Sequence, residues 1–483
     1  MSVSSAPAAA AASTVAASPA SLFAQQQLRA PVLRRESAEE RAGRIRKLSQ
    51  WIEQNRRAIE EALYADFRKP PAETDVTEIW SSQVEIKHTL SHLKQWMKPR
   101  RVGTPLSLMG TTSWVHYEPK GVCLIIAPWN YPFYLAIDPL VSALAAGNCC
   151  IIKPSEMTPA VAALLSRMAR ELFDPAEVAV VEGDKDVATA LLQLPFNHIF
   201  FTGSPAVGKV VMRAAAEHLT SVTLELGGKS PVLVDATANL RDAAEKIVWG
   251  KFINAGQTCV APDYVLVQES VQEQFVEEVR RAVSRFYDPA GQGVINSQSF
   301  ARIVNKHHFA RVSGLLEDAQ RAGAHVALGG IVDGNQCFIE PTLLLDAAPD
   351  SRVMQEEIFG PLLPIQPFTT LMQAADFVND RPKPLALYLF TESSENQRYL
   401  LQNVAAGGCC INETILHLAH PDLPFGGVGN SGMGKAHGHY GFLAFSNEKA
   451  VLKQRTGRTG IKFMYPPYTP KVQKMVDWLM RLF

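Results

Sequence analysis

Residues 121–156 read GVCLIIAPWNYPFYLAIDPLVSALAAGNCCIIKPSE, and this stretch decides the class of fold. Residues 122–126 form a continuous apolar run, which is typical of a β-strand covered on both faces. The apolar spacing then predicts a helix over residues 135–146 and a second buried strand over residues 149–153. A strand, a helix and a strand in this order form one unit of a parallel sheet.

The same alternation continues towards the C-terminus. The pattern predicts a helix over residues 160–173, a strand over 178–181, a short helix, and a strand over 198–201. It predicts an α/β fold with a doubly wound, Rossmann-type parallel sheet, in which ligands bind at the carboxyl ends of the strands. Functional residues should therefore lie in the segments that follow strands, which are 128–130, 153–156 and 202–204.

Two glycine-rich segments resemble nucleotide-binding motifs, and only one is placed to bind a phosphate. Residues 203–210, GSPAVGKV, mimic a P-loop, but Val210 stands where a magnesium-binding hydroxyl is required, which disfavours nucleotide hydrolysis. The segment still follows a strand and opens a helix, so its backbone N–H groups can bind the pyrophosphate of a cofactor. Residues 427–432, GVGNSG, match the dinucleotide motif but follow a loop, which argues against that role.

Cys259 is the strongest candidate for a nucleophile. It lies in NAGQTCVAPD, residues 254–263, among small and polar neighbours, and it follows ELGGKSP, residues 225–231. The thiol of Cys259 and the carboxylate of Glu225 form a pair suited to covalent catalysis. The alternative for Cys259 is a buried, inert thiol, which is the common state of a free cysteine.

A second α/β segment begins near residue 232 and includes a polar helical run over residues 300–323. His307 and His308 lie in this run, and we interpret them as part of a solvated helix face. His417 follows Asn-Glu-Thr at residues 412–414 and is expected to form a structural hydrogen bond. The histidines therefore add no catalytic candidate.

Both ends of the chain differ from its middle. Residues 1–22 are rich in Ala and Ser and carry no charge, so we expect a disordered tail over residues 1–25 and order from about Ser37. Ser37 and Glu40 have capping-box spacing, a further helix is predicted over residues 75–97, and a β-like arm over 112–117. Residues 472–483 predict an amphipathic helix too short to span a membrane, which would dock on the protein's own oligomer or on a membrane surface; we favour the first.

Composition restricts the partners and the compartment. The 483 residues predict two or three domains, and 47 basic and 47 acidic side chains cancel, so no global positive field attracts nucleic acid or acidic lipid. The seven cysteines lack CxxC or Cys/His ligand spacing, which argues against a metal site and favours a reduced, cytoplasmic protein. A secretory signal is not recognisable, whereas a transit peptide stays open.

Six motifs in order resemble the aldehyde dehydrogenase superfamily. They are PWNYP (128–132), KPSE (153–156), FTGS (201–204), ELGGK (225–229), GQTC (256–259) and EEIFGP (356–361). CVAPDY (259–264) and LPFGGVG (423–429) resemble its class 3 branch, which includes fatty, aromatic and coniferyl-type aldehyde dehydrogenases. The resemblance covers residues 30–455.

The resemblance implies the family's fold, an α/β architecture with a Rossmann-type cofactor domain, an α/β catalytic domain and a small β arm for oligomerisation. The implied NAD(P)-binding domain comprises residues 26–104 and 122–228, and the catalytic domain, which carries Cys259, comprises 229–415. Oligomerisation or bridging elements are expected over 105–121 and 416–460, and a C-terminal amphipathic tail over 461–483.

The family's mechanism, carried over to this sequence, implies three catalytic residues. Cys259 as thiolate attacks the aldehyde carbon, and the oxyanion is held by the Asn130 side-chain amide and the Cys259 backbone N–H. Hydride transfer leaves a thioester, and Glu225 activates the water that releases the acid. The structural alternatives are a turn residue for Asn130 and a carboxylate that accepts local backbone N–H groups for Glu225.

The resemblance also implies an NAD(P) site. Glu357 would bind the nicotinamide ribose and, in this branch, also assist as a base, with Phe359 beside the ribose or, alternatively, in plain core packing. Lys153 and Glu156 would hold the adenosine ribose; Glu156 repels a 2′-phosphate and Lys153 attracts one, so NAD is favoured and NADP stays open. The other implied cofactor-binding residues are Trp129, Gly203, Ser204, Gly208 and Leu226.

We therefore expect oxidation of a small-molecule aldehyde to its acid, in the cytoplasm, by a homodimer or tetramer. Coniferyl-type aromatic and medium-chain aliphatic aldehydes both fit, and we favour the first. Two alternatives remain: an acylating enzyme that passes the thioester to coenzyme A, and a non-catalytic structural or binding relative. Glu225 argues against the first of these, and the complete set of Cys259, Asn130, Glu225 and Glu357 argues against the second.

Overall fold

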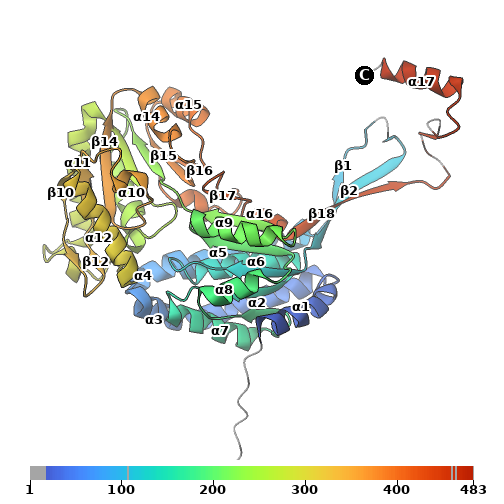
Figure 1. The fold of residues 1–483 in the computed structure, drawn as a ribbon, viewed down its shortest axis with the longest axis horizontal. Helices are drawn as coiled ribbons and strands as arrows, with labels where there is room; N and C mark the ends of the chain where they lie inside the picture. Colours follow the sequence, from blue (N-terminus) through green and yellow to red (C-terminus); the bar gives the residue numbers. More distant parts are fainter. Residues whose placement is uncertain (1–17, 106–107, 458, 460, 463–464, 482–483) are drawn as a thin grey trace, which may run out of the picture.

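The computed structural model describes residues 18–105, 108–457, 459, 461–462 and 465–481. The chain forms two α/β units, each built on its own sheet, which lie side by side, and a β arm projects from one of them (Figure 1). The predicted α/β fold class is therefore confirmed. The domain boundaries given above stay a proposal.

The first sheet has six strands in the order β17-β7-β6-β3-β4-β5, and all neighbours are parallel except β17 and β7. Alternate residues of β3 pack into two separate apolar cores, one on each face, which explains why its sequence is apolar throughout. The strands are β3 (Val122–Ile126), β4 (Cys149–Lys153), β5 (Val178–Val180), β6 (His198–Gly203), β7 (Ser221–Leu226) and β17 (Gly432–Met433).

Helices cover both faces of this sheet, as a doubly wound fold requires. One face is covered by α2 (Ala38–Gln54), α5 (Ser81–Trp96), α6 (Tyr134–Ala146) and α7 (Pro159–Leu172). The other face is covered by α1 (Pro19–Leu33), α8 (Lys185–Leu192) and α9 (Pro205–Ala216). The predicted strands and helices of residues 121–203 are confirmed to within two residues at each end.

The expectation of a disordered tail over residues 1–25 is wrong for its last part, because helix α1 begins at Pro19. The Ser18 hydroxyl caps this helix by accepting from Ser21 N, and Leu22 and Phe23 are buried against the first sheet. The apolar surface that these two side chains bury offsets the entropy of ordering the segment. Order therefore starts before Ser37, and residues 1–17 of the predicted tail lie outside the described residues.

Helix α2 starts with the predicted capping box of Ser37 and Glu40, and α3 (Arg56–Phe67) follows. The helix predicted over residues 75–97 is longer than expected and changes type along its length. It comprises α4 (Pro71–Thr74), a π-helical turn η1 (Asp75–Trp80) and α5. Such π-turns are frequent at functional sites, and this one faces a cavity described below.

The second sheet has seven strands in the order β10-β13-β14-β9-β8-β15-β16, parallel except for β10. The strands are β8 (Pro231–Val234), β9 (Tyr264–Gln268), β10 (His325–Leu328), β13 (Thr342–Leu345), β14 (Leu362–Phe368), β15 (Ala386–Phe390) and β16 (Gly408–Ile411). The ribbon β11 (Val332–Asp333) and β12 (Phe338–Ile339) is separate. The helices around this sheet are α10 (Leu240–Phe252), α11 (Gln272–Tyr287), α12 (Lys306–Arg321), α13 (Arg352–Gln355), α14 (Leu371–Asn379) and α15 (Ser394–Asn403).

The helix predicted over residues 300–323 begins only at Lys306. Asn305 stops it from starting earlier, because its side chain accepts a hydrogen bond from His308 N in the manner of an N-cap. The preceding residues instead pair their backbone with distant segments, since Arg302 N donates to Phe67 O and Ile303 N donates to Cys337 O.

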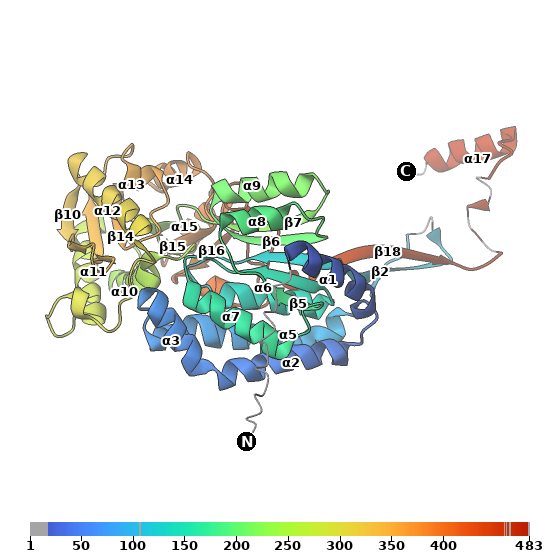
Figure 2. The same cartoon turned by 60° about the horizontal axis from the view of Figure 1, so that its bottom comes forward.

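The β arm is a three-stranded antiparallel sheet of β1 (Arg100–Val102), β2 (Thr111–Pro119) and β18 (Ser446–Gln454), so the predicted β-like segment 112–117 is confirmed. Helix α16 (Gly438–Ala444) leads into it, and α17 (Pro470–Met480) lies beyond its end, away from the body (Figure 2). Helix α17 has no buried residue. Within the described residues, no helix combines the length and apolarity needed to cross a membrane.

Candidate active site

Cys259 lies in a tight loop between the 3-10 turn η3 (Ile253–Gly256) and β9. Asn254 and Ala255 have φ angles of 55° and 52°, and Gly256 has 77°, so three successive residues are left-handed. A Cβ on Gly256 would lie 2.3 Å from Gly360 O, which explains the glycine at this position. The loop is therefore strained and must be held in place by its surroundings.

Side-chain hydrogen bonds hold this loop. The Glu73 carboxylate accepts from Asn254 N (2.9 Å), and the Asn254 amide donates to Asn130 O (2.8 Å). The Gln257 side chain donates to Arg302 O (3.0 Å) and accepts from Val304 N (2.9 Å). All of these contacts are buried or half-buried, so the position of the thiol is set by segments far away in the sequence.

Asn130 follows β3, as expected, and is buried beside the loop. Its Nδ2 donates one hydrogen bond to Gln257 O (3.0 Å), two residues before Cys259. An amide nitrogen carries two hydrogens, so this bond orients the group and leaves one hydrogen for an oxyanion. The oxyanion role of Asn130 stays a prediction.

Glu225 is the fifth residue of β7 and pairs with Gly432 of β17. Its side chain is buried, and Oε1 has no hydrogen-bond partner among the described residues. Burial raises the pKa of its carboxyl to about 8, although His437 and Lys435 oppose this rise. A buried carboxyl with a free oxygen and a pKa near neutrality is suited to take a proton from a reacting group.

Burial also raises the pKa of the Cys259 thiol to about 12, and the carboxylates of Glu225 and Glu357 add to this effect. The thiol must therefore pass its proton to a base before it attacks. Glu225 and Glu357 are the two acidic side chains that raise its pKa most, and burial raises the pKa of Glu357 to about 7.

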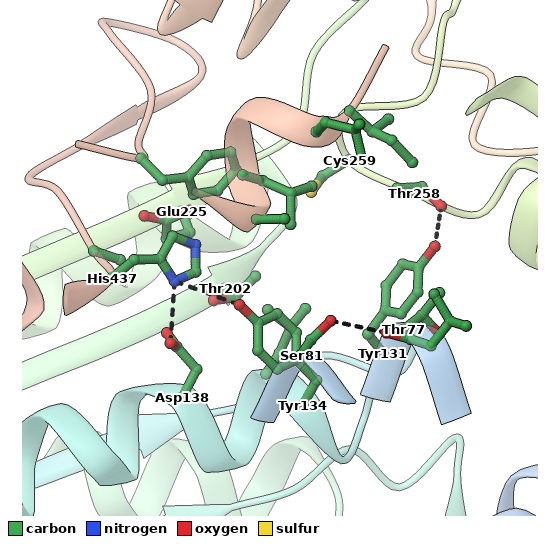
Figure 3. Close-up of a pocket in the computed structure, with 18 of the residues that line it drawn as sticks. Thr77, Ser81, Tyr131, Tyr134, Asp138, Thr202, Glu225, Thr258, Cys259 and His437 are labelled. Atoms are coloured by element: carbon green, nitrogen blue, oxygen red, sulfur yellow. Dashed lines mark hydrogen bonds and ion pairs between the residues drawn. The ribbon is translucent and has the colours of Figure 1, made fainter. Parts of the chain in front are cut away.

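Cys259 lies where two cavities meet. One is an apolar cavity of about 120 Å³, and the other is a more polar cleft of about 290 Å³. Thr202, Glu225 and Cys259 line both (Figure 3 shows the apolar side). The apolar cavity is lined mainly by aromatic and aliphatic side chains, among them Val76, Trp80, Phe200, Trp249, Ile253, Ile415, Leu416 and Phe425.

Most of the residues predicted for the cofactor line the polar cleft. They are Trp129, Gly203, Ser204, Leu226, Glu357 and Phe359, together with the three catalytic candidates. Ser204 caps helix α9, so the N-terminus of this helix faces the cleft and offers backbone N–H groups to an anion. Gly227 also lines the cleft. A Cβ at this position would lie 2.3 Å from Glu357 Oε2, so only a glycine leaves room for that carboxylate. Glycines at these positions keep room for a bound group.

Three predicted cofactor residues do not line this cleft. Lys153 ends β4 and pairs with Glu156 (Nζ to Oε2, 2.7 Å), and neither residue lines the cleft. Gly208 lies in α9, where a Cβ would be 2.7 Å from Leu226 Cδ2. Gly208 therefore lets α9 pack closely on β7, and its part in cofactor binding stays a prediction.

The interpretation of His308 as a solvated residue is wrong. Its ring lies 4.7 Å from the Trp129 ring, and it lines the polar cleft, whereas His307 is exposed. Burial lowers the pKa of His308 to about 4, so the ring is neutral. Arg311, one turn later in α12, donates to Ile358 O (2.7 Å) and also lines the cleft. The i, i+3 spacing of these two residues was the signal that could have found them.

The sequence reasoning also missed Asp138 and His437, which line the apolar cavity and form an ion pair (Nδ1 to Oδ1, 3.0 Å). The available signal was Asp138 itself, the one charged residue in the apolar helix α6. His417 forms the expected structural hydrogen bond, since its Nδ1 lies 3.2 Å from Cys410 Sγ.

Comparison with known proteins gives a consistent result. The model of the "Aldehyde dehydrogenase family" matches residues 2–451. The chain is 47% identical over 432 residues to the 4,4'-diaponeurosporen-aldehyde dehydrogenase of Staphylococcus aureus, covering 89% of this chain and 92% of that protein. It is 44% identical over 456 residues to a "Probable coniferyl aldehyde dehydrogenase" of Pseudomonas aeruginosa, covering 94% of each.

Two solved structures are similar to this chain over at least 90% of its length. The substrate-bound state of Staphylococcus aureus AldH has a TM-score of 0.90 and 44% identity, covering 95% of this chain and 98% of that one. An indole-3-acetaldehyde dehydrogenase in complex with NAD⁺ has a TM-score of 0.82 and 25% identity, covering 90% of this chain and 89% of that one.

Proposed function

Since the chain belongs to the aldehyde dehydrogenase family, we propose that it oxidises an apolar aldehyde to the carboxylic acid through a thioester on Cys259, with NAD preferred over NADP. One observation carries the proposal: Cys259 and Glu225 both lie at the junction of an apolar cavity and a polar cleft. The aldehyde would enter from the first and the cofactor from the second, and they would meet at the thiol.

The first step needs the proton of the Cys259 thiol to leave. Glu225 or Glu357 takes it, because burial raises the pKa of these carboxyls to about 8 and about 7 and so makes each carboxylate a stronger base than usual. The thiolate then attacks the aldehyde carbon, a C–S bond forms, and the carbonyl oxygen becomes an oxyanion. The Asn130 amide and the Cys259 backbone N–H stabilise this charge, as two donors of an oxyanion hole.

The polar cleft fits a nicotinamide dinucleotide. The family uses NAD or NADP, and the bound cofactor supplies a hydride acceptor. Ser204 and the N-terminus of α9 would hold the pyrophosphate, and Glu357 would hold a ribose, since Gly227 leaves its carboxylate exposed to the cleft. Glu156 favours NAD, because its carboxylate repels a 2′-phosphate.

Release of the acid depends on Glu225. It takes a proton from water as the water oxygen attacks the acyl carbon of the thioester, and the C–S bond then breaks with sulfur as the leaving group. Among the described residues Glu225 Oε1 has no hydrogen-bond partner, so its position in β7 orients the carboxyl. The same base argues against transfer of the acyl group to coenzyme A, which requires water to be excluded.

The lining of the apolar cavity supports an apolar substrate. Trp80 and Leu416 are half-exposed at its outer end, and Trp249 and Ile253 follow further in. Such a lining favours coniferyl-type aromatic or medium-chain aliphatic aldehydes over sugars and phosphorylated aldehydes. We favour the coniferyl type, to which the name of the Pseudomonas relative also points.

The β arm supports a homodimer. Strands β2 and β18 pair along nine residues and project from the body, which leaves an extended edge for a second copy. Sedimentation velocity would test this, since a monomer at all concentrations would contradict it. The cytoplasmic location likewise stays a proposal from composition.

The test is an assay of the purified protein on coniferyl aldehyde and nonanal with NAD and with NADP, following reduced nicotinamide. Cys259→Ala should abolish turnover, while the matched control Cys337→Ala, a cysteine outside both cavities, should keep it. The preferred aldehyde and cofactor decide the finer assignment. No turnover with any pair would overturn the proposal.

A further inference from the structure

We propose that the buried ion pair of Asp138 and His437 places an imidazolium beside Glu225, which favours the ionised, water-activating form of this carboxyl. His437 would thus be a positioning residue that acts on the reaction through the charge it places beside Glu225. This inference rests on the proposed function, and it explains an ion pair in a cavity that is lined mainly by apolar side chains.

The geometry of the pair is specific. His437 precedes α16 with a φ of 68°, and its Nδ1 lies 3.0 Å from Asp138 Oδ1 on α6. The Tyr134 hydroxyl lies 3.5 Å from the same nitrogen. Figure 3 shows the ring of His437 between Asp138 and Glu225, with its other nitrogen on the side of Glu225. Both members of the pair are buried.

Other titratable groups face this imidazole. Glu85 on α5 belongs to the same cluster, since one polar atom each from Glu85, Asp138 and His437 lies within 4.8 Å of the others. Glu85 accepts from Gly438 N (2.9 Å). Two further titratable groups lie nearby. Burial and the charge of His437 lower the pKa of His417 to about 4, so this ring is neutral, and Lys435 lowers the pKa of Glu225.

The charges in this cluster favour a protonated His437. Burial alone would lower its pKa, but Asp138, Glu85 and Glu225 outweigh burial and raise it to about 9. A positive ring beside Glu225 favours the carboxylate, and among its neighbours His437 is the largest influence that opposes the effect of burial. Asp138 acts in two ways: it holds the imidazolium in place, and its own charge raises the pKa of Glu225.

The alternative is that the pair only supports the fold, because the cluster ties α5, α6 and α16 together. A double substitution separates these roles. His437→Gln leaves the Asp138 carboxylate facing Glu225 without its cation, so Glu225 should ionise at higher pH. Asp138→Asn with His437→Gln removes both charges and should largely restore ionisation, although it removes more of the native packing.

The experiment measures the pH dependence of p-nitrophenyl acetate hydrolysis, which by the proposed mechanism uses Cys259 as nucleophile and Glu225 as base and needs no hydride acceptor. In His437→Gln the acid limb should move up by about one pH unit, so that the rate below the limb falls about tenfold. In the double variant the limb should return to within about half a unit of the wild-type value. Asp66→Asn serves as the control and should leave the limb unchanged, because this half-buried carboxyl lies outside the cavity and accepts from Ala160 N and Val161 N at the start of α7.

The outcomes are distinguishable. An unshifted limb in His437→Gln, or an equal shift in the double variant, overturns the inference while the proposed function stands. Absence of hydrolysis by the wild-type protein, together with absence of aldehyde oxidation, overturns the proposed function instead. His437→Asn provides a second neutral side chain if His437→Gln loses its cooperative thermal transition.

Discussion

Glu225 and Cys259 come from different sheets and line the same two cavities. Glu225 belongs to β7 of the six-stranded sheet, and Cys259 lies in the loop that leads to β9 of the seven-stranded sheet. The proposed base and nucleophile therefore lie at the interface between the two α/β units. Any motion of one unit relative to the other would change the distance between Glu225 and Cys259.

Glu225→Gln should separate the two halves of the reaction. The thiol can still be acylated, because Glu357 remains as a second base, but water is no longer activated. We expect steady-state turnover to fall by about 10²–10⁴, while a single-turnover burst of reduced nicotinamide stays visible in stopped flow. Loss of the burst together with turnover would show that Glu225 is needed for the first step.

Glu225→Gln should also change how stability depends on pH. The pKa of this carboxyl is raised from 4.5 to about 8 in the folded protein, so the folded state retains a proton that the unfolded chain has lost. Its contribution to stability is complete below about pH 4.5 and is lost as the pH rises towards 8.

Glutamine stays neutral, so the variant should keep the stability that the wild-type protein loses at alkaline pH. We expect its Tm to exceed the wild-type value at pH 9 by at least about 2 °C and to match it near pH 5. Glu61→Gln, an exposed glutamate, is the control. Equal Tm differences at both pH values would contradict the prediction.

Gly227→Ala should weaken cofactor binding. The added Cβ would lie 2.3 Å from Glu357 Oε2 and would displace the carboxylate from the polar cleft. We expect the KM for NAD to rise by about tenfold or more, with little change in hydrolysis of p-nitrophenyl acetate, which uses no cofactor. Gly43→Ala is the matched control, because a Cβ there would meet no described atom within 4 Å. An unchanged KM for NAD in the first variant would argue against Glu357 as a cofactor ligand.

Glu156→Gln should shift cofactor preference towards NADP. The substitution removes the charge that repels a 2′-phosphate and releases Lys153, which pairs with Glu156 at 2.7 Å. The ratio of kcat/KM for NADP to that for NAD should rise by about tenfold, which corresponds to about 1.4 kcal/mol. Glu392→Gln, on the surface, should leave the ratio unchanged, and the same result for Glu156→Gln would place the adenosine ribose elsewhere.

Lys69→Met should destabilise the protein strongly. Lys69 and Glu78 are both fully buried and pair at 2.8 Å, and the Lys69 ammonium also lies 4.0 Å from the centre of the Tyr131 ring. Removal of the lysine leaves a buried unpaired carboxylate, which costs about 3–5 kcal/mol of the free energy of unfolding. Arg57→Met breaks an exposed pair and should have little measurable effect by urea titration. Equal midpoints for both variants would refute the prediction.

Local patterns predicted a large part of this protein. The apolar runs of β3 and β4 and the helical spacing of α6 are local signals, because a strand buried on both faces must be apolar throughout. Ser37 and Glu40 predicted the start of α2 for the same reason, since a helix cap depends on residues only three positions apart.

Other features could not be read locally. Helix α1 is stable only because Leu22 and Phe23 meet the apolar face of the first sheet, which lies more than a hundred residues away in the sequence. His308 lines the cleft because α12 packs beside Trp129; its spacing from Arg311 places both residues on one helix face, but the fold decides what that face meets. The burial of a side chain depends on what is packed against it, and that is decided by the whole fold.

The order of strands and helices over residues 121–203, and Cys259 and Glu225 as candidates for nucleophile and base, could be read from the sequence, because they follow from residue type and spacing. The tertiary structure alone decided that these two groups meet between an apolar and a polar cavity, and that Asp138 and His437 place a charge beside them. The reason is physical: cavity shape, burial and the pKa values that burial changes arise from contacts between segments distant in sequence.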